Sequence, residues 1–161
     1  MEIRSDEAGN AVGAELDAFQ VIKCKPGAFI GGTANARGDH DGTSDPTTLF
    51  TVTGDVLVRV FGVCTTNITG QGTIEVGVAG NTAGLIAQVA DAEDIDKNDV
   101  WIDSSVAEVG IAALTNIPAT SVIVNGLDII ETIGTANLTA GEVYYVCMWR
   151  PLTPGSSVVA A

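Results

Sequence analysis

The sequence predicts an all-β protein: an antiparallel β-sandwich or barrel of about eight to nine short strands, with an N-terminal arm. Valine, isoleucine and threonine account for 50 of the 161 residues, and branching at Cβ favours strands over helices. These residues fall in short alternating runs separated by turn residues, at the roughly 8–12-residue spacing of sandwiches and barrels. No long helical period interrupts the runs, so a parallel βαβ layout is not expected.

Residues 1–47 form the predicted N-terminal arm and long loop. One or two short strands are expected around 18–24 and 28–31, before a polar stretch from Asn35 to Pro46. Loops this long are usually functional or disordered. The apolar side chains of the arm must be buried either in the protein's own sandwich or against a neighbouring subunit, and we favour the neighbour. The predicted partner-contact residues are Phe19, Val21, Ile22, Phe29 and Ile30.

Residues 48–161 form the predicted sandwich domain, which ends in an uncharged tail at 151–161. The expected strands lie at 49–52, 55–64, 73–79, 85–90, 100–102, 119–124, 127–133 and 142–150. Residues 106–114 fit a strand or one helical turn equally well. The tail is apolar as well as uncharged, and such a chain end is expected to pack against something.

Two of these strands define the expected core. In the first, Val56, Val58, Val60 and Cys64 share one face. The opposite face is also mostly apolar, which predicts a central strand covered on both sides and requires Arg59 to reach a partner or an interface edge. In the last strand, the shared face is Val143, Tyr145, Cys147 and Trp149.

The dipeptide Asn125-Gly126 separates two apolar runs. This is the strongest short-range hairpin signal, because a type I′ turn needs a positive φ at both central residues. The sequence therefore predicts a hairpin between 119–124 and 127–133.

The charge of the chain limits its partners. Twenty acidic residues against seven basic ones give a formal net charge of -13. Nucleic acid and anionic membrane surfaces both require basic side chains, so neither is an expected partner. No apolar run approaches the ~18 residues of a membrane span. The acidic start lacks the apolar segment of a signal peptide, so synthesis in a cytoplasm is expected.

Three cysteines, Cys24, Cys64 and Cys147, are far apart in the chain. In a cytoplasm they should stay reduced, and buried free thiols are the simplest interpretation. A Cys64–Cys147 pairing stays open if their strands are neighbours.

The remaining motifs favour no reaction centre. His40 is the only histidine and is expected to be a solvated loop residue, because no Gly-x-Ser-x-Gly elbow accompanies it. The tripeptide at 37–39, Arg-Gly-Asp, is short enough to occur by chance. The Asn67 and Asn137 sequons are expected to be turn residues. We therefore expect no enzyme and no cofactor.

The acidic segment 91–99 partly resembles a calcium loop. Asp94, Asp96 and Asn98 match the first ligand positions, but Asp99 stands where glycine is needed and Ser105 where the bidentate glutamate should be. A solvated acidic loop is therefore expected rather than a metal site, and an adventitious cation there stays open.

Four segments carry a family resemblance: Thr51 to Asn67, Ile74 to Ala83, Asn125 to Ile130, and Trp149 to Leu152. Together they resemble small virion structural proteins of tailed bacteriophages, over residues 48 to 161; the arm lies outside the match. The resemblance implies a capsid decoration (cement) protein on the capsid exterior, with the major capsid protein and copies of itself, as a homotrimer, for partners. It implies no catalytic residues.

Two alternatives stay open at this point. The first is a tail or head-fibre component with a host-binding role, although fibres favour long repeats and the chain shows none. The second is a non-viral carbohydrate-binding β-sandwich, although such proteins favour exposed aromatic residues, which make up only 5% of this chain. The net charge is consistent with decoration, because identical acidic copies repel one another away from the shell.

Overall fold

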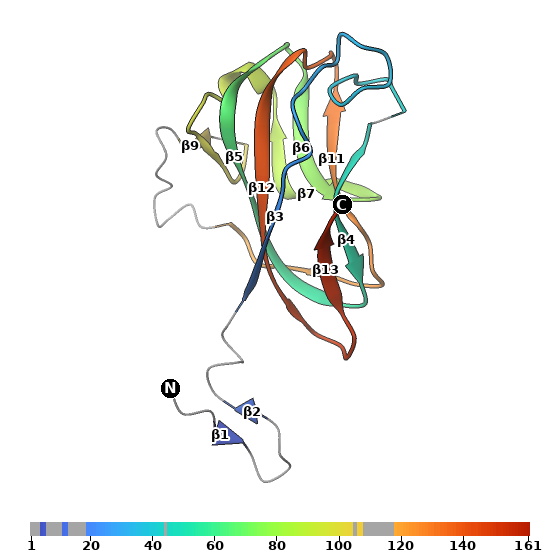
Figure 1. The fold of residues 1–161 in the computed structure, drawn as a ribbon, viewed down its shortest axis with the longest axis vertical. Coiled ribbons are helices and arrows are strands. Elements are labelled where there is room, and N and C mark those ends of the chain that lie inside the picture. Colours follow the sequence, from blue (N-terminus) through green and yellow to red (C-terminus); the bar gives the residue numbers. More distant parts are fainter. Residues whose placement is uncertain (1–3, 6–10, 13–18, 44, 105, 108–117) are drawn as a thin grey trace.

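The protein is a two-layer β-sandwich (Figure 1). The computed structural model describes residues 4–5, 11–12, 19–43, 45–104, 106–107 and 118–161. Eleven strands form two antiparallel sheets, and neither sheet closes into a barrel. The only helical element in the described ranges is one 3-10 turn, η1 (Ala92–Asp94). The all-β prediction is confirmed, and of its two forms the sandwich is correct.

The larger sheet has the strand order β3-β12-β5-β8-β9, with β10 paired to the same edge of β5 as β8. Its strands are β3 (Gln20–Cys24), β5 (Val56–Thr69), β8 (Val100–Trp101), β9 (Val106–Ala107), β10 (Ser121–Ile123) and β12 (Ala140–Pro151). The smaller sheet has the order β13-β4-β11-β6-β7. Its strands are β4 (Thr47–Thr53), β6 (Thr73–Val78), β7 (Asn81–Val89), β11 (Ile129–Gly134) and β13 (Ser157–Ala160). A separate two-stranded sheet joins β1 (Arg4–Ser5) to β2 (Ala11–Val12).

The strand count exceeds the predicted eight or nine for two reasons. β9 has only two residues, which is too short to produce an alternation pattern, and it lies in the ambiguous stretch 106–114, whereas β8 lies within the predicted strand 100–102. The tail forms β13, which pairs with β4 and buries Val158, so the apolar chain end packs on its own sandwich.

The core lies between the sheets, and alternation predicted its main strands correctly. Val56, Val58, Val60 and Cys64 of β5 are at most 1% exposed. The neighbouring β12 buries its predicted face in the same layer, with the Tyr145 ring edge-on to Trp101 at 6.2 Å. These contacts remove a continuous apolar surface from water, which is the main term stabilising the fold.

The prediction that β5 is covered on both sides is wrong for the described residues. The strand is central, but its second face, from Leu57 to Val63, is only half-buried and lies on the outside of the sandwich. Arg59 on this face donates from Nε to Thr120 Oγ1 at 2.7 Å, so it reaches the segment that leads into β10.

The arm residues from Gln20 onward are part of the sandwich. β3 pairs with β12 along its length, as predicted for 18–24. The second expected strand, 28–31, is not a strand. Instead the chain from Ile30 to Asp45 folds into consecutive turns, in which an N–H donates to the carbonyl three residues earlier at 33, 36, 39, 42 and 45. Small and turn-forming residues make this series more favourable than an extended strand.

The predicted hairpin at Asn125-Gly126 is also wrong. Both residues have the expected positive φ, 58° and 66°. The strands that they connect, however, belong to different sheets, because β10 pairs with β5 while β11 pairs with β4 and β6. The turn instead hydrogen-bonds to the β4–β5 turn, from Gly126 N to Gly54 O and from Asn125 N to Asp55 Oδ1.

The turn series docks on the segment before β12 through glycine. Gly31 N donates to Leu138 O and Leu138 N donates to Gly38 O, at 2.9 and 2.8 Å. Gly38 has φ +102°, and a Cβ at this position would collide with the Leu138 carbonyl oxygen.

Replacing Gly38 with alanine should therefore destabilise the protein by about 2–3 kcal/mol, because both the dihedral angle and the backbone contact oppose a side chain. The matched control is Gly32→Ala, since Gly32 in the same series has open space around its Cβ position. Chemical denaturation followed by circular dichroism measures both variants. Equal stability of the two would contradict this docking.

Candidate functional site

The five predicted partner-contact residues do not form one surface. Val21 and Ile30 are exposed, at 59% and 52%. Phe19 and Ile22 are half-buried, and Ile22 packs against the core. Phe29 is buried in the protein's own core, where the Arg37 guanidinium lies 3.9 Å from its ring centroid. Its side chain is thus not a partner contact in this fold, while contact through the exposed members stays a prediction.

A buried polar cluster lies beneath the turn series. Glu131 on β11 is fully buried. Arg37 donates to both of its carboxylate oxygens, from Nε at 2.9 Å and from Nη2 at 2.6 Å. The Tyr145 hydroxyl of β12 donates to Glu131 Oε2, and Arg37 Nη1 donates to Gly27 O. The cluster therefore joins both sheets and the turn series.

The environment fixes the charge states in this cluster. Burial raises the pKa of the Tyr145 phenol well above its usual range, and the Glu131 carboxylate raises it further. For Arg37, burial opposes the charged form, but the attraction of Glu131 leaves the pKa of the guanidinium raised overall. Tyr145 therefore remains a neutral donor and Arg37 a cation, which suits a structural network with every partner satisfied.

Sequence reasoning missed this cluster. Glu131 occupies the inward phase of β11 between Ile129 and Ile133, which is a readable signal for a buried carboxylate. Its cation comes from the Arg-Gly-Asp tripeptide at 37–39, whose Arg37 and Asp39 are both buried. These two side chains are not presented on the surface, so integrin-type recognition does not fit this geometry.

The lone histidine lies in a small group of possible metal ligands. His40 is half-buried rather than solvated, with Nδ1 2.6 Å from Asn137 Oδ1. Ligand atoms of Asp39, His40 and Asp41 lie within 4.8 Å of one another. Asp39 Oδ2 already accepts a hydrogen bond from Asn35 N. The group is thus tied into the turn series by its own hydrogen bonds.

Local hydrogen bonds organise the acidic segment 91–99. Asp91 caps η1 by accepting from Glu93 N, and Asp99 Oδ2 accepts from Asp96 N. Asn67 bridges to the same segment by donating to Asp96 Oδ1. Carboxylates used as caps in this way satisfy backbone N–H groups at chain bends.

The three cysteines are free and buried. β5 and β12 are neighbours, but their register places Cys147 opposite Val60 and Cys64 opposite Val143, so the two thiols do not face each other. Burial raises the pKa of Cys64 to about 11 and that of Cys147 to about 12. Neutral thiols in such surroundings act as small apolar side chains.

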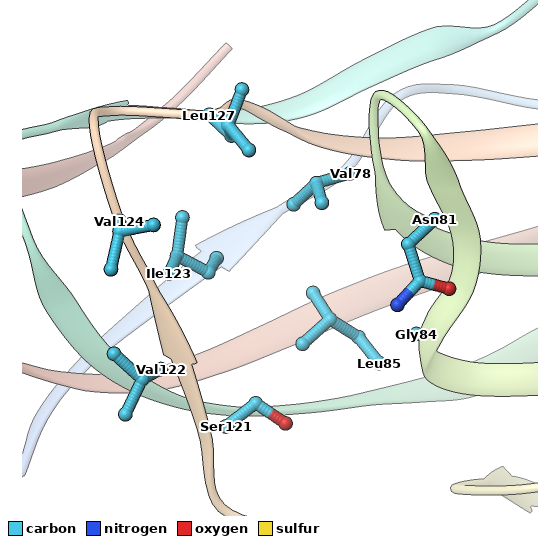
Figure 2. Close-up of a pocket in the computed structure, with 9 residues that line it drawn as sticks. All are labelled: Val78, Asn81, Gly84, Leu85, Ser121, Val122, Ile123, Val124 and Leu127. Atoms are coloured by element: carbon cyan, nitrogen blue, oxygen red, sulfur yellow. The ribbon is translucent and has the colours of Figure 1, made fainter.

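An open apolar groove lies on one side of the sandwich, between β7 of the smaller sheet and β10 of the larger (Figure 2). We call it the β7–β10 groove. Its lining residues are Val78, Asn81, Gly84, Leu85, Ser121, Val122, Ile123, Val124 and Leu127. Each of these strands has one unpaired edge among the described residues, because β7 is the last strand of the smaller sheet and β10 pairs only with β5.

The groove suits the side chains of another protein better than a small molecule. Its volume is about 130 Å³, well below the roughly 300 Å³ at which ligand pockets usually begin. Val122, Val124 and Leu127 at its rim are exposed, at 57%, 49% and 38%. Exposed aliphatic residues gathered at one place indicate an interaction surface, whereas scattered ones do not.

The opposite side of the sandwich is closed. There β3 and β13, the edge strands of the two sheets, contact each other. The described part of the chain contains no helix that is long and apolar enough to cross a membrane.

Comparison with known proteins leaves the family open. No protein-family model, curated protein or solved structure matches the chain. The function is therefore argued from the surfaces described above and from the resemblance noted in the sequence.

Replacing Glu131 with alanine should destabilise the protein by about 3–5 kcal/mol, because Arg37 would remain buried without its counter-ion. The control is Glu75→Ala on β6, where the carboxylate accepts a hydrogen bond from Gln88 at an exposed position; its effect should stay below about 1 kcal/mol. Denaturant titration measures both. Similar losses for the two variants would rule out a special role for the buried pair.

The thiols give a pH-dependent prediction. Above the ordinary thiol pKa of 9.0 the unfolded chain releases protons that the native protein retains until about pH 11 at Cys64 and about pH 12 at Cys147. The free energy of unfolding should therefore fall as the pH rises through this window. In the Cys147→Ala variant the fall should be less steep.

A disulfide reagent should label no thiol of the native protein below pH 9 and three after denaturation. Rapid native labelling would show that a thiol is accessible.

Proposed function

We propose that the protein is a virion structural protein of a tailed bacteriophage, which decorates the exterior of the capsid after synthesis in the host cytoplasm. It binds the major capsid protein and stabilises the shell by bridging its subunits. The β7–β10 groove, with its exposed aliphatic rim, is the observation that carries this proposal, and the sequence resemblance supplies the identity of the partner.

The groove supports a binding role because of the chemistry of its lining. Among the described residues that line it, only Asn81 and Ser121 have polar side chains, and none is titratable. Such a surface gains free energy by removing aliphatic side chains from water and offers no group for acid–base or nucleophilic chemistry. A segment of a neighbouring capsid subunit with apolar side chains is the occupant that we propose.

The rest of the molecule fits a protein displayed in many copies. A net charge of -13 keeps free copies apart, while a short-range apolar contact can still form at the shell. We propose a homotrimer as the assembly, since closed symmetric oligomers are the common form and a trimer suits the threefold positions of a capsid.

The proposal predicts saturable binding to particles that lack the protein. Val124 lies on the groove rim, whereas Val159 lies on β13 at the opposite side of the sandwich. The two side chains are almost equally exposed, at 49% and 51%. Val124→Asp should lower the affinity by about tenfold or more, because one buried valine contributes roughly 1.5–3 kcal/mol. Val159→Asp should bind like the parent protein.

Co-sedimentation of each purified protein with undecorated capsids measures the occupancy, and circular dichroism confirms that each variant is folded. Failure of the parent protein to bind any particle would contradict the proposed function. Binding that is lost equally in both variants would contradict the groove as the contact.

A further inference from the structure

The outward face of the larger sheet is more apolar than is usual for a sheet face in contact with water. Figure 1 shows β12 between β3 and β5, and these three strands form the face. Its outward apolar residues are the exposed Val21 and the half-buried Leu57, Phe61, Val63 and Met148. Val146 lies on the same side of the sheet but is buried. An antiparallel sheet with one face in water normally alternates apolar and polar residues. Here both faces are largely apolar, so the outer face is suited to a contact.

The same face collects most of the positive charge of the chain. Its cations are Lys23, Lys25, Arg59 and Arg150. They are four of only seven basic residues in a protein of net charge -13. Lys23 Nζ and Lys25 Nζ lie 5.6 and 5.7 Å from the centroid of the Tyr144 ring. The ring thus holds two ammonium groups close together at one end of the face.

A second aromatic ring organises the other two cations. The guanidinium carbons of Arg59 and Arg150 lie 5.1 and 5.8 Å from the centroid of Phe19. Arg59 is further fixed by its bond from Nε to Thr120. Cation–π contacts of this kind orient guanidinium groups but leave most of their hydrogen-bond donors unused.

In the register of the described strands, no carboxylate stands directly opposite Lys23, Arg59 or Arg150. Within the described part of the chain, none of the four forms an ion pair with an aspartate or glutamate. The partners in register across the face are apolar or aromatic: Met148 lies between Val21 and Arg59, and Val146 lies between Lys23 and Phe61. Four like charges held together in this way repel one another, and carboxylates from another molecule would relieve the repulsion.

We propose that this face, defined by the four cations and by Val21, Leu57, Phe61, Val63 and Met148 and called the basic face, docks an acidic, partly apolar surface of a partner protein. The identity of the partner as the capsid rests on the proposed function. The acidic character of the partner surface is inferred from the basic face alone. Carboxylates of the partner pair with the lysines and arginines, while aliphatic side chains between them cover Phe61 and Met148. Charge complementarity of this kind fixes orientation and register at an interface.

A protein fits this face better than nucleic acid or a membrane does. Aliphatic side chains separate the cations across the face, whereas a phosphate backbone favours continuous basic tracks. A protein surface can offer a few carboxylates among apolar side chains and match both features.

The basic face is continuous with the β7–β10 groove. Val122 of the groove rim pairs with Leu57 of the face across the β10–β5 ladder, and its side chain is 57% exposed. One partner can therefore cover the groove and the face together.

The test uses the full chain with two probes: undecorated capsids, and a soluble synthetic peptide that alternates glutamate and leucine. Lys23→Glu and Arg150→Glu should each weaken binding to both probes by about tenfold or more, and added salt should weaken the parent protein in the same way. The matched control is Lys97→Glu, which makes the same charge change at an exposed position in the acidic segment. It should alter the affinity by less than about twofold.

Thermal melting first establishes that the three variants are folded, and Lys23→Gln provides a milder variant if Lys23→Glu is not. Capsid binding that is unaffected by the basic-face variants would overturn the inference and leave the proposed function standing. Binding to the peptide without binding to capsids would overturn the proposed function and leave the inference about the basic face standing. Binding to neither probe would overturn both.

Two further measurements distinguish other occupants. Tighter binding to duplex DNA or to phosphatidylserine vesicles than to the peptide would overturn the assignment of a protein partner. A dimer or larger assembly in light scattering that dissociates in Lys23→Glu but not in Lys97→Glu would assign the face to a second copy of the chain, and would overturn the assignment to a different protein.

Discussion

The Glu131 carboxylate buried between the two sheets sets the constraint that the N-terminal half of the fold must satisfy. A carboxylate that is removed from water needs a cation and further donors, because an unpaired buried charge costs several kcal/mol. Arg37 and Tyr145 supply them. Arg37 can reach Glu131 only when the turn series lies across the end of the sandwich, and that position requires the close backbone approach at Gly38. The arm is thus held in place by polar pairing as well as by burial of Phe29.

The charge distribution separates stability from recognition. The one cation that stabilises the interior, Arg37, is buried and doubly bonded to its partner. The cations of the basic face are held by aromatic rings and lie outside the core. Acidic residues such as those of segment 91–99 are used in local caps and loops. A protein of this charge can therefore repel its own copies through most of its surface and still present one face to a partner of opposite charge.

The sequence was sufficient for the fold class and for the inward faces of β5 and β12, because alternation is a local pattern that burial imposes directly. It was insufficient wherever the deciding contact is distant. Arg37 and Glu131 lie 94 residues apart, and Asn125-Gly126 forms the predicted turn while its flanking strands pair elsewhere. The basic face was hidden for the same reason, since its cations come from three strands whose register no local pattern specifies. Only Arg59 indicated this face in the sequence, because it is a charged residue on the outward side of a strand whose other side is buried.

The two sides of the sandwich differ in a way that bears on how it can be mounted on a surface. On one side the edge strands β3 and β13 contact each other. On the other side β7 and β10 leave the groove open, with unpaired strand edges and exposed aliphatic residues. Such edges favour aggregation unless they are covered or protected by charge. The net charge of -13 supplies protection in solution, so the open side can be retained for a specific contact. A partner that occupies the groove would therefore cover the exposed aliphatic residues and the unpaired edges of β7 and β10 at the same time.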